Sequence, residues 1–117
     1  MMQKERLADS KKDAIEHLPL FGNFTEVHLA YDERAVKVHT RIRVRNPNYQ
    51  LDTVYGDRNS RVITTTVGRV FFNEILPSKM GFINKLVDKN YLSGLIWQCY
   101  HVSGHEATVK VLESCLQ

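Results

Sequence analysis

The chain has 117 residues, of which 43% are hydrophobic and 25% are charged, so its length and composition suit one small globular domain. Its formal net charge of +3 is compatible with a polyanionic partner without being diagnostic of one. No apolar run is long enough to span a bilayer and the N-terminus lacks the apolar core of a signal peptide, so we expect a cytoplasmic protein with no membrane partner.

The first predicted elements are a charged tail and a short helix. Residues 1–17 mix acidic and basic side chains, which is typical of a solvated tail or helix, and residues 18–117 are predicted to form a single α+β domain. Residues 23–32 favour a helix, because Asn23 is a good N-cap and Glu26 stands three residues later, as in a capping box. The apolar side chains on its inner face are Val27, Ala30 and Tyr31.

The clearest strand covers residues 36–45, where apolar and basic side chains alternate. The side chains predicted to face the core are Val36, Val38, Thr40, Ile42 and Val44. A loop or irregular hairpin is expected over residues 46–61, with a weak strand around residues 51–55, because proline and asparagine follow Arg45. Residues 62–65 predict a second strand, antiparallel to the first.

Helices are predicted for the rest of the chain. Thr65 or Thr66 caps a helix that Pro77 ends, and Asp88 caps a longer helix that runs to about Val102. A capping box from Ser103 to Glu106 opens the last helix. The side chains predicted on its inner face are Thr108, Val111, Leu112 and Cys115. The predicted fold is therefore α+β, with a small antiparallel sheet, several short helices and a C-terminal helical pair.

The best candidate for chemistry is the basic face of the first strand. Its outward side chains are Lys37, His39, Arg41, Arg43 and Arg45. Residues on one face of a strand repeat at about 6.6–7 Å, close to the phosphate spacing of a nucleic acid. The competing interpretations are a solvated outer face of a two-sided sheet, or an edge strand whose charges prevent further pairing. Arg69 follows Gly68 at a helix start, where it either binds an anion or pairs with an acid such as Glu74.

Metal and catalytic sites find less support. Cys99, His101, His105 and Cys115 are potential zinc ligands, but a Ser-Gly break separates the two histidines, so buried thiols and surface histidines are the favoured interpretation. We expect no catalytic residue, since the sequence has no nucleophile motif, phosphate loop or convincing carboxylate pair. Trp97 is predicted to lie in the core or at a subunit interface.

One stretch of sequence nevertheless resembles a known family. Residues 65–77 read TTVGRVFFNEILP, and the chain continues with Phe82, Asn84, Asp88, Lys89, Leu92, Leu95 and Ile96. In this order the residues resemble a segment of the largest catalytic subunit, β′, of bacterial DNA-directed RNA polymerase. Two further segments are similar to that family. They contain His39, Arg41, Ile42, Val44 and Arg45, and then Cys99, Tyr100, Gly104, Thr108 and Val109.

The resemblance covers about residues 20–117 and implies a non-catalytic fragment of a nucleotidyltransferase. It implies a place in the pore region beside the secondary channel, with nucleoside triphosphates, DNA and RNA nearby, and with the rest of β′ and the other core subunits as partners. The family's magnesium-binding aspartate loop and zinc-binding cysteines are not matched here, so both metals are expected elsewhere in the full subunit. A stand-alone nucleic-acid-binding module or a protein-interaction module remains the alternative.

Overall fold

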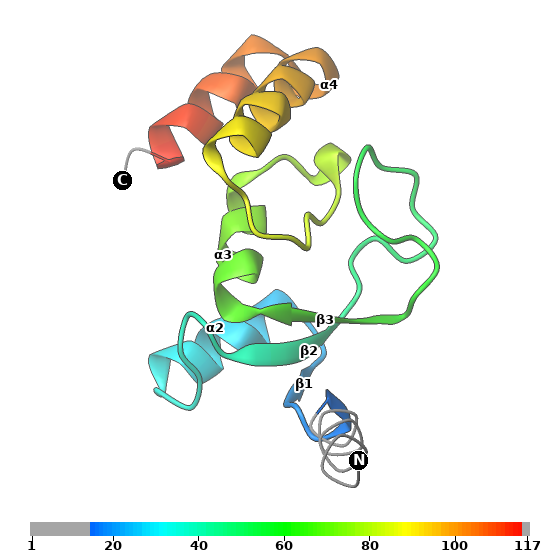
Figure 1. Cartoon of the computed structure of the whole chain (residues 1–117), viewed down its shortest axis with the longest axis vertical. Helices are drawn as coiled ribbons and strands as arrows, with labels where there is room; N and C mark the ends of the chain where they lie inside the picture. The colour runs from blue at the N-terminus through cyan, green and yellow to red at the C-terminus, as the bar shows by residue number, and fades with distance from the viewer. Residues whose placement is uncertain (1–14, 116–117) are drawn as a thin grey trace, which may run out of the picture.

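The computed structural model, described for residues 15–115, is a three-stranded sheet with short helices that lead to a long helical segment (Figure 1). The elements in chain order are β1 (Leu20–Phe21), α2 (Phe24–Asp32), β2 (Arg41–Arg45), β3 (Val62–Thr66), α3 (Val67–Ile75), the 3-10 helix η1 (Ser78–Met80) and α4 (Lys89–Cys115). The predicted α+β class is confirmed. The predicted charged tail, residues 1–17, lies almost entirely outside the described residues.

The sheet has the strand order β1-β2-β3 and is mixed. β2 and β3 are antiparallel, with Arg41 opposite Thr66 and Arg45 opposite Val62, which confirms the predicted pair. β1 runs parallel to β2, so the sheet is not purely antiparallel as predicted. Because β1 has only two residues, it is too short to show alternation, and no pattern in the sequence predicts this strand.

β2 begins at Arg41, so the strand predicted over residues 36–45 is wrong in its first half. Its partner β3 ends at Thr66, the residue opposite Arg41, because the chain turns directly into α3 at Val67. The residues before Arg41 therefore have no neighbouring strand with which to form a ladder, and they adopt turns instead.

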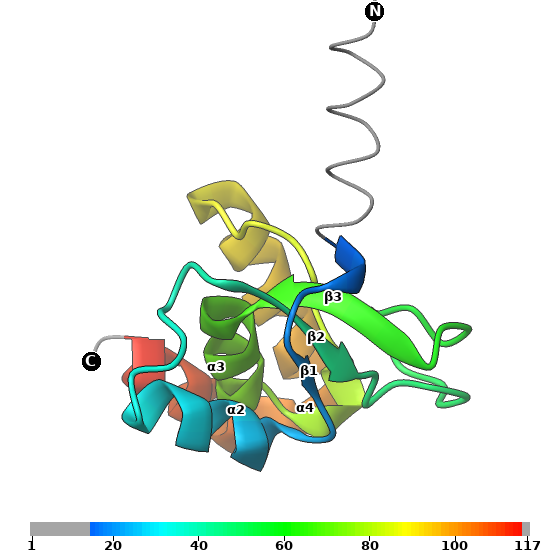
Figure 2. The same cartoon turned by 90° about the horizontal axis from the view of Figure 1, so that it is seen from below.

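The alternation within β2 does place one face of the strand in a core. Ile42 and Val44 are fully buried beneath α2 and α3, which lie on the same side of the sheet (Figure 2). The buried members of this first core cluster are Val27, Val36, Ile42, Val44, Ile63, Val67, Val70 and Phe82. Each such aliphatic side chain stabilises the fold by about 1.5–3 kcal/mol when it leaves water.

The two short helices begin at side-chain caps that the sequence predicts. Asn23 Oδ1 accepts the N–H of Glu26 at 2.9 Å, and Thr66 Oγ1 accepts the N–H of Arg69 at 3.3 Å. The capping box of α2 is modified, because the Glu26 carboxylate accepts the N–H of Gly22 at 2.5 Å. These local contacts fix where each helix starts.

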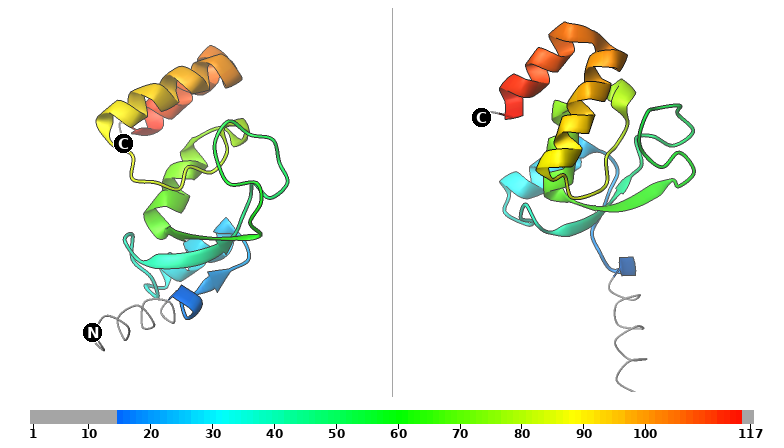
Figure 3. Two further views of the ribbon diagram at one scale, coloured as in Figure 1. Left: turned by 45° about the vertical axis from the view of Figure 1, so that its right-hand side comes forward. Right: turned by 45° about the horizontal axis from the view of Figure 1, so that its top comes forward.

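α4 consists of two helical arms that meet at Gly104, and the predicted C-terminal pair is confirmed (Figure 3). Asp88 caps the first arm, accepting the N–H of Tyr91 at 2.8 Å. Gly104 has φ 85° and ψ −176°, values that break the helix immediately after Ser103. Ser103 therefore does not cap the second arm as predicted, and its buried Oγ has no hydrogen-bond partner among residues 15–115. Thr108 Oγ1 donates to the carbonyl of Gly104 at 2.8 Å.

A second core cluster joins these arms to the segment after α3. Its buried members are Leu76, Met80, Ile83, Leu95, Cys99 and Val111. The predicted burial of Cys99, Thr108 and Val111 is confirmed. Leu112 and Cys115 are exposed, contrary to the prediction, because the second arm buries only the Thr108–Val111 side of its surface.

The segment 46–61 is a loop, as predicted, but the weak strand expected around residues 51–55 does not form. The buried side chain of Asn46 organises it by donating to the carbonyls of Asp57 at 2.5 Å and Ser60 at 2.7 Å. Hydrogen bonds from the Ser60 side chain and the Asn59 N–H lower the pKa of the Asp57 carboxyl. Polar contacts thus replace a ladder in this loop.

Candidate nucleic-acid interface

The outer face of the sheet carries the arginines of β2. Because Ile42 and Val44 point into the core, Arg41, Arg43 and Arg45 project from the opposite face. Arg41 and Arg45 are exposed, and neither makes an ion pair with another residue between positions 15 and 115. This face therefore offers two cationic side chains at the ends of one short strand.

Arg43, between them, is held by the backbone that precedes β1. Its Nη2 donates to the carbonyl of Glu16 at 2.8 Å and to that of Leu18 at 3.2 Å, and its Nε donates to Leu18 at 3.3 Å. The Arg43 N–H also donates to the carbonyl of Pro19 at 2.7 Å. Arg43 thus attaches the entering chain to the sheet, and its guanidinium has fewer donors left for a phosphate.

Lys37 does not lie on the arginine row. Its N–H donates to Thr40 Oγ1 at 2.8 Å and its carbonyl accepts the N–H of Thr40 at 3.0 Å, which closes a turn before β2. Lys37 and His39 are both exposed, but they leave this turn rather than a strand. The structure therefore brings together Arg41, Arg43 and Arg45, and places Lys37 on a separate segment.

Arg69 lies in the first turn of α3, where sequence analysis considered an anion site. The N–H groups of Val67 and Gly68 donate to the carbonyls of Thr40 at 3.2 Å and Val38 at 2.8 Å. The N–H of Arg69 is occupied by the capping threonine. Since these three donors already have partners, they are not available to an anion, and any phosphate contact would rest on the Arg69 side chain.

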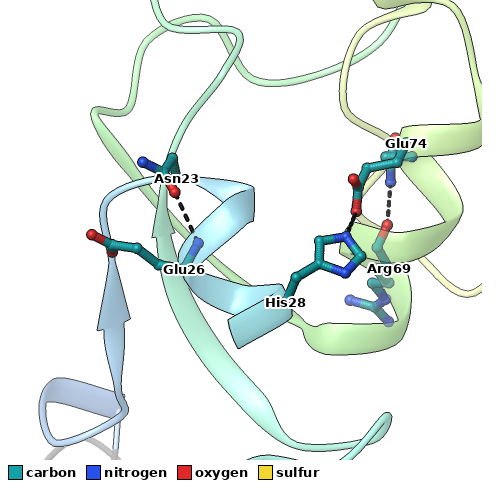
Figure 4. A network of polar contacts seen from close by, with 6 residues as sticks. Asn23, Glu26, His28, Arg69 and Glu74 are labelled. Atoms are coloured by element: carbon teal, nitrogen blue, oxygen red, sulfur yellow. Dashed lines mark hydrogen bonds and ion pairs between the residues drawn. The ribbon is translucent and has the colours of Figure 1, made fainter. Parts of the chain in front are cut away.

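The side chain of Arg69 contacts an amide rather than an acid. Its Nη1 donates to Asn84 Oδ1 at 3.2 Å, and Asn84 Nδ2 donates to the carbonyl of Thr64 on β3 at 2.8 Å. Glu74, the acid considered as its partner, instead contacts His28 Nε2 at 2.5 Å across α2 and α3 (Figure 4). The ring of His28 also stacks on Phe71, 4.6 Å between centroids.

Residues of the sequence motif at 65–77 connect α3 to its neighbours at two places, which are called joints below. Gly68 lies so close to Val38 that an added Cβ would meet its Cγ1 at 3.0 Å. Asn73 donates to the carbonyls of Arg69 at 2.8 Å and Ile83 at 2.9 Å, and accepts the N–H of Ile83 at 2.6 Å. These residues therefore fix how α3 meets the turn before it and the segment after it.

The described residues do not assemble a metal site. Between residues 15 and 115 no group of three or more histidine, cysteine, aspartate or glutamate side chains is placed to hold an ion. Of the two cysteines considered as zinc ligands, Cys99 is buried, as expected for a structural thiol, whereas Cys115 is exposed. The same part of the chain contains no helix long and apolar enough to cross a membrane.

Sequence reasoning missed several exposed apolar side chains. Leu86 is 82% exposed in the segment before α4. Trp97 is 60% exposed, which excludes the core and leaves a subunit interface as the remaining predicted alternative. Trp97 contacts the ring of His101 at 4.0 Å between centroids, and Tyr100 is exposed beside it. For Trp97, the available signal was its position outside the periodic apolar face of α4, which indicates exposure.

The comparisons with known proteins agree with the resemblance stated from the sequence. The β′ subunit of DNA-directed RNA polymerase from Methylacidiphilum infernorum is 44% identical over 96 residues, which is 82% of this chain. The β′ subunits from Opitutus terrae and Rhodopirellula baltica are 39% identical over 98 residues and 38% identical over 100 residues. They cover 84% and 83% of this chain. No protein-family model matches the chain.

This chain belongs to the family of the β′ subunit of DNA-directed RNA polymerase. Each of these relatives is far longer than the chain. The chain spans about 7% of the length of the three β′ subunits.

Proposed function

We propose that this chain serves as a β′-type segment of a DNA-directed RNA polymerase, in the wall of the pore or secondary channel near the active centre. In this role it is a non-catalytic part of a nucleotidyltransferase that carries out DNA-templated transcription. The observation that carries the proposal is 44% identity over 82% of the chain to a protein named as the β′ subunit. The rest of β′ and the other core subunits are its proposed partners, in the cytoplasm.

The contacts of the motif residues support a wall rather than a reaction centre. The motif residues Gly68 and Asn73 hold elements together, and neither has a side chain that titrates, so neither can act as a general acid or base. The magnesium and zinc ions of the assembled enzyme are proposed to bind outside this segment. The role of the segment is then to position neighbouring parts of the enzyme and to shape the passage beside them.

The arginine face gives this wall a charge. Arg41 and Arg45 are exposed on the side of the sheet opposite the first core cluster. Two cations on a rigid strand produce a positive field, which attracts nucleotide triphosphates or a nucleic-acid backbone. Lys37, on the turn before β2, and Arg69, on α3, are the further cations proposed to contribute to this field, whereas Arg43 has a mainly structural role.

The test is the state of the native polypeptide. An antibody to residues 65–76 is used on lysate of the cells that make this protein, before and after purification of core polymerase. We expect a very large band that remains with the polymerase through salt washes. A band at 13.6 kDa that separates from polymerase would overturn the proposal.

A stand-alone nucleic-acid-binding module is the second candidate, because Arg41 and Arg45 are exposed in the chain itself. It predicts that the purified chain binds single-stranded RNA at moderate salt. Replacing both arginines with glutamine would then flatten the dependence of binding on log salt by about 1.4, or about 0.7 per lost phosphate contact. Arg34→Gln with Arg58→Gln, two exposed arginines outside β2, is the matched control. An unchanged slope would remove this candidate.

A further inference from the structure

A hollow of about 320 Å³ lies where the turn before β2, the start of α3 and the segment before α4 meet. Its lining residues are Val38, His39, Thr66, Gly68, Arg69, Phe72, Lys85, Leu86 and Val87. The polymerase proposal and the arginine face of β2 leave this hollow without a role. The residues of its walls and rim indicate which kind of ligand would fit it.

The walls of the hollow are mainly aliphatic and partly open to solvent. Leu86 is 82% exposed and Val38 is 40% exposed, so two branched apolar side chains stand at the mouth without cover. Phe72 and Val87 are half-buried and pack against the second core cluster, which makes the inner wall firm. An exposed apolar hollow with a fixed inner wall is typical of a site that receives an apolar side chain from a partner.

The rim of the hollow is basic. Arg69 and Lys85 line it together with His39, and none of its lining residues is acidic. Lys85 Nζ lies 3.9 Å from the centroid of the Tyr91 ring, and Arg69 is oriented by Asn84, so both cations have defined positions. The nearby carboxylate of Asp88 is directed to the N–H of Tyr91 and does not line the hollow.

This combination favours a polypeptide over a nucleic acid. Phosphate sites commonly use free backbone N–H groups at a helix start, and here those of Val67, Gly68 and Arg69 already have partners. Base recognition uses exposed aromatic faces, whereas the open walls of this hollow are leucine and valine. Charge complementarity instead selects a chain that carries carboxylates beside an apolar anchor.

We propose that this hollow is a docking site for an acidic segment of another polypeptide, with a leucine-like side chain inserted between Val38 and Leu86. Carboxylates on either side of that anchor pair with Arg69 and Lys85 on the rim. The apolar contact supplies most of the affinity, and the charges select the sequence and its orientation. This inference holds whether or not the chain works within a polymerase.

The test uses the full 117-residue chain and a fluorescent synthetic peptide in which leucines are flanked by glutamates. Fluorescence anisotropy measures its binding, with a peptide carrying lysine for glutamate as the charge control. Lys85→Glu and Leu86→Ser are each expected to weaken binding about tenfold. Both side chains are exposed, and circular dichroism verifies that the variants are folded.

Matched controls make the same chemical changes elsewhere. Lys110→Glu and Leu112→Ser alter exposed residues of α4 that do not line the hollow, and they are expected to leave binding unchanged. Amide NMR shifts on binding should map to residues 38–39, 66–72 and 85–87. Equal binding of the lysine peptide, equal losses in the control variants, or no peptide binding would each overturn the proposal. Amide NMR shifts at the hollow on addition of oligothymidine, without any from the peptide, would also overturn the proposal.

Discussion

The sheet with α2 and α3, and the helical pair of α4, each have an apolar core, but they differ in what surrounds it. The first core cluster draws most of its buried side chains from α2, β2, β3 and α3, and Val36 and Phe82 come from the segments between elements. The second draws on α4 and on the short segment between α3 and α4. Trp97, Tyr100 and Leu112 remain exposed on the helical pair. A more open core predicts that α4 is the less stable part.

The largest expected effects come from cavities in the two cores. Ile42→Ala and Leu95→Ala each truncate a side chain that is at most 1% exposed, and each should lower the free energy of unfolding by about 2–5 kcal/mol. Trp97, the one tryptophan, reports on α4 by fluorescence, while far-UV circular dichroism reports on all helices. In urea, the fluorescence transition of Leu95→Ala should occur at a lower urea concentration than its dichroism transition. For Ile42→Ala, the midpoints of both transitions should fall by the same amount.

Coincident transitions in both variants would contradict this difference. The chain would then unfold as one cooperative unit, with the two core clusters coupled through the end of α3. Native-state hydrogen exchange gives a second readout for the same variants. Leu95→Ala should increase exchange in α4 while β2 and β3 remain protected, and uniform loss of protection would again favour a single unit.

A smaller effect is expected at the joint between the two regions. Asn73 in α3 makes three hydrogen bonds, two of them with the backbone of Ile83, which is 2% exposed. Asn73→Ala leaves the buried N–H of Ile83 without its partner and should cost about 2–4 kcal/mol of unfolding free energy. The Trp97 transition should shift more than that of the sheet, because the joint sets the path of the chain into α4.

Asn90→Ala is the control for this joint. Asn90 is exposed in the first turns of α4, and its side chain makes no hydrogen bond with another described residue, so the change should stay within about 0.5 kcal/mol. A loss at Asn73 no larger than at Asn90 would mean that neighbouring groups or water replace the missing amide. The joint would then contribute little to the coupling of the two regions.

The sequence predicts local structure in this chain well, for a physical reason. The caps at Asn23, Thr66 and Asp88 involve partners three residues away, so the pattern contains both sides of each contact. The alternation of residues 41–45 likewise predicts which side chains of β2 are buried. Such features need no knowledge of distant segments.

The predictions are wrong where a segment far away in the sequence determines the extent of an element or the burial of a side chain. Alternation continues back to Val36, yet the strand starts at Arg41, because β3 ends at the residue opposite. Leu112 has the right spacing for an inner face, but the turn at Gly104 sets which side of the second arm meets the first. Periodicity identifies apolar faces and cannot identify the surface that covers them.

The candidate site shows the same limit. A basic row was predictable from residue identity, but its division into exposed Arg41 and Arg45 and a bonded Arg43 depends on the carbonyls of residues 16 and 18. The hollow beside Leu86 was not predictable, since three segments far apart in the sequence form it. The contacts made by a site residue, and not its type alone, decide whether it is available.

The smallest expected effects distinguish two glycines of α4. Gly104 has φ 85° and ψ −176°, a conformation open almost only to glycine, and an added Cβ would meet nothing within 4 Å. Gly104→Ala should therefore cost about 1–3 kcal/mol through the backbone alone. Gly94 is helical and equally uncrowded, so Gly94→Ala should add about 0.5–1 kcal/mol of stability.

Thermal unfolding monitored by Trp97 fluorescence compares the two variants directly, because both changes lie in the helical pair that this side chain reports. Opposite shifts are expected, downward for Gly104→Ala and upward for Gly94→Ala. If Gly104→Ala left the transition unchanged, the two arms would tolerate another angle, and the second core cluster would not fix their geometry. If Gly94→Ala lowered it, the exposed face around Trp97 would contact a neighbour, such as a second copy of the chain, that a methyl group disturbs.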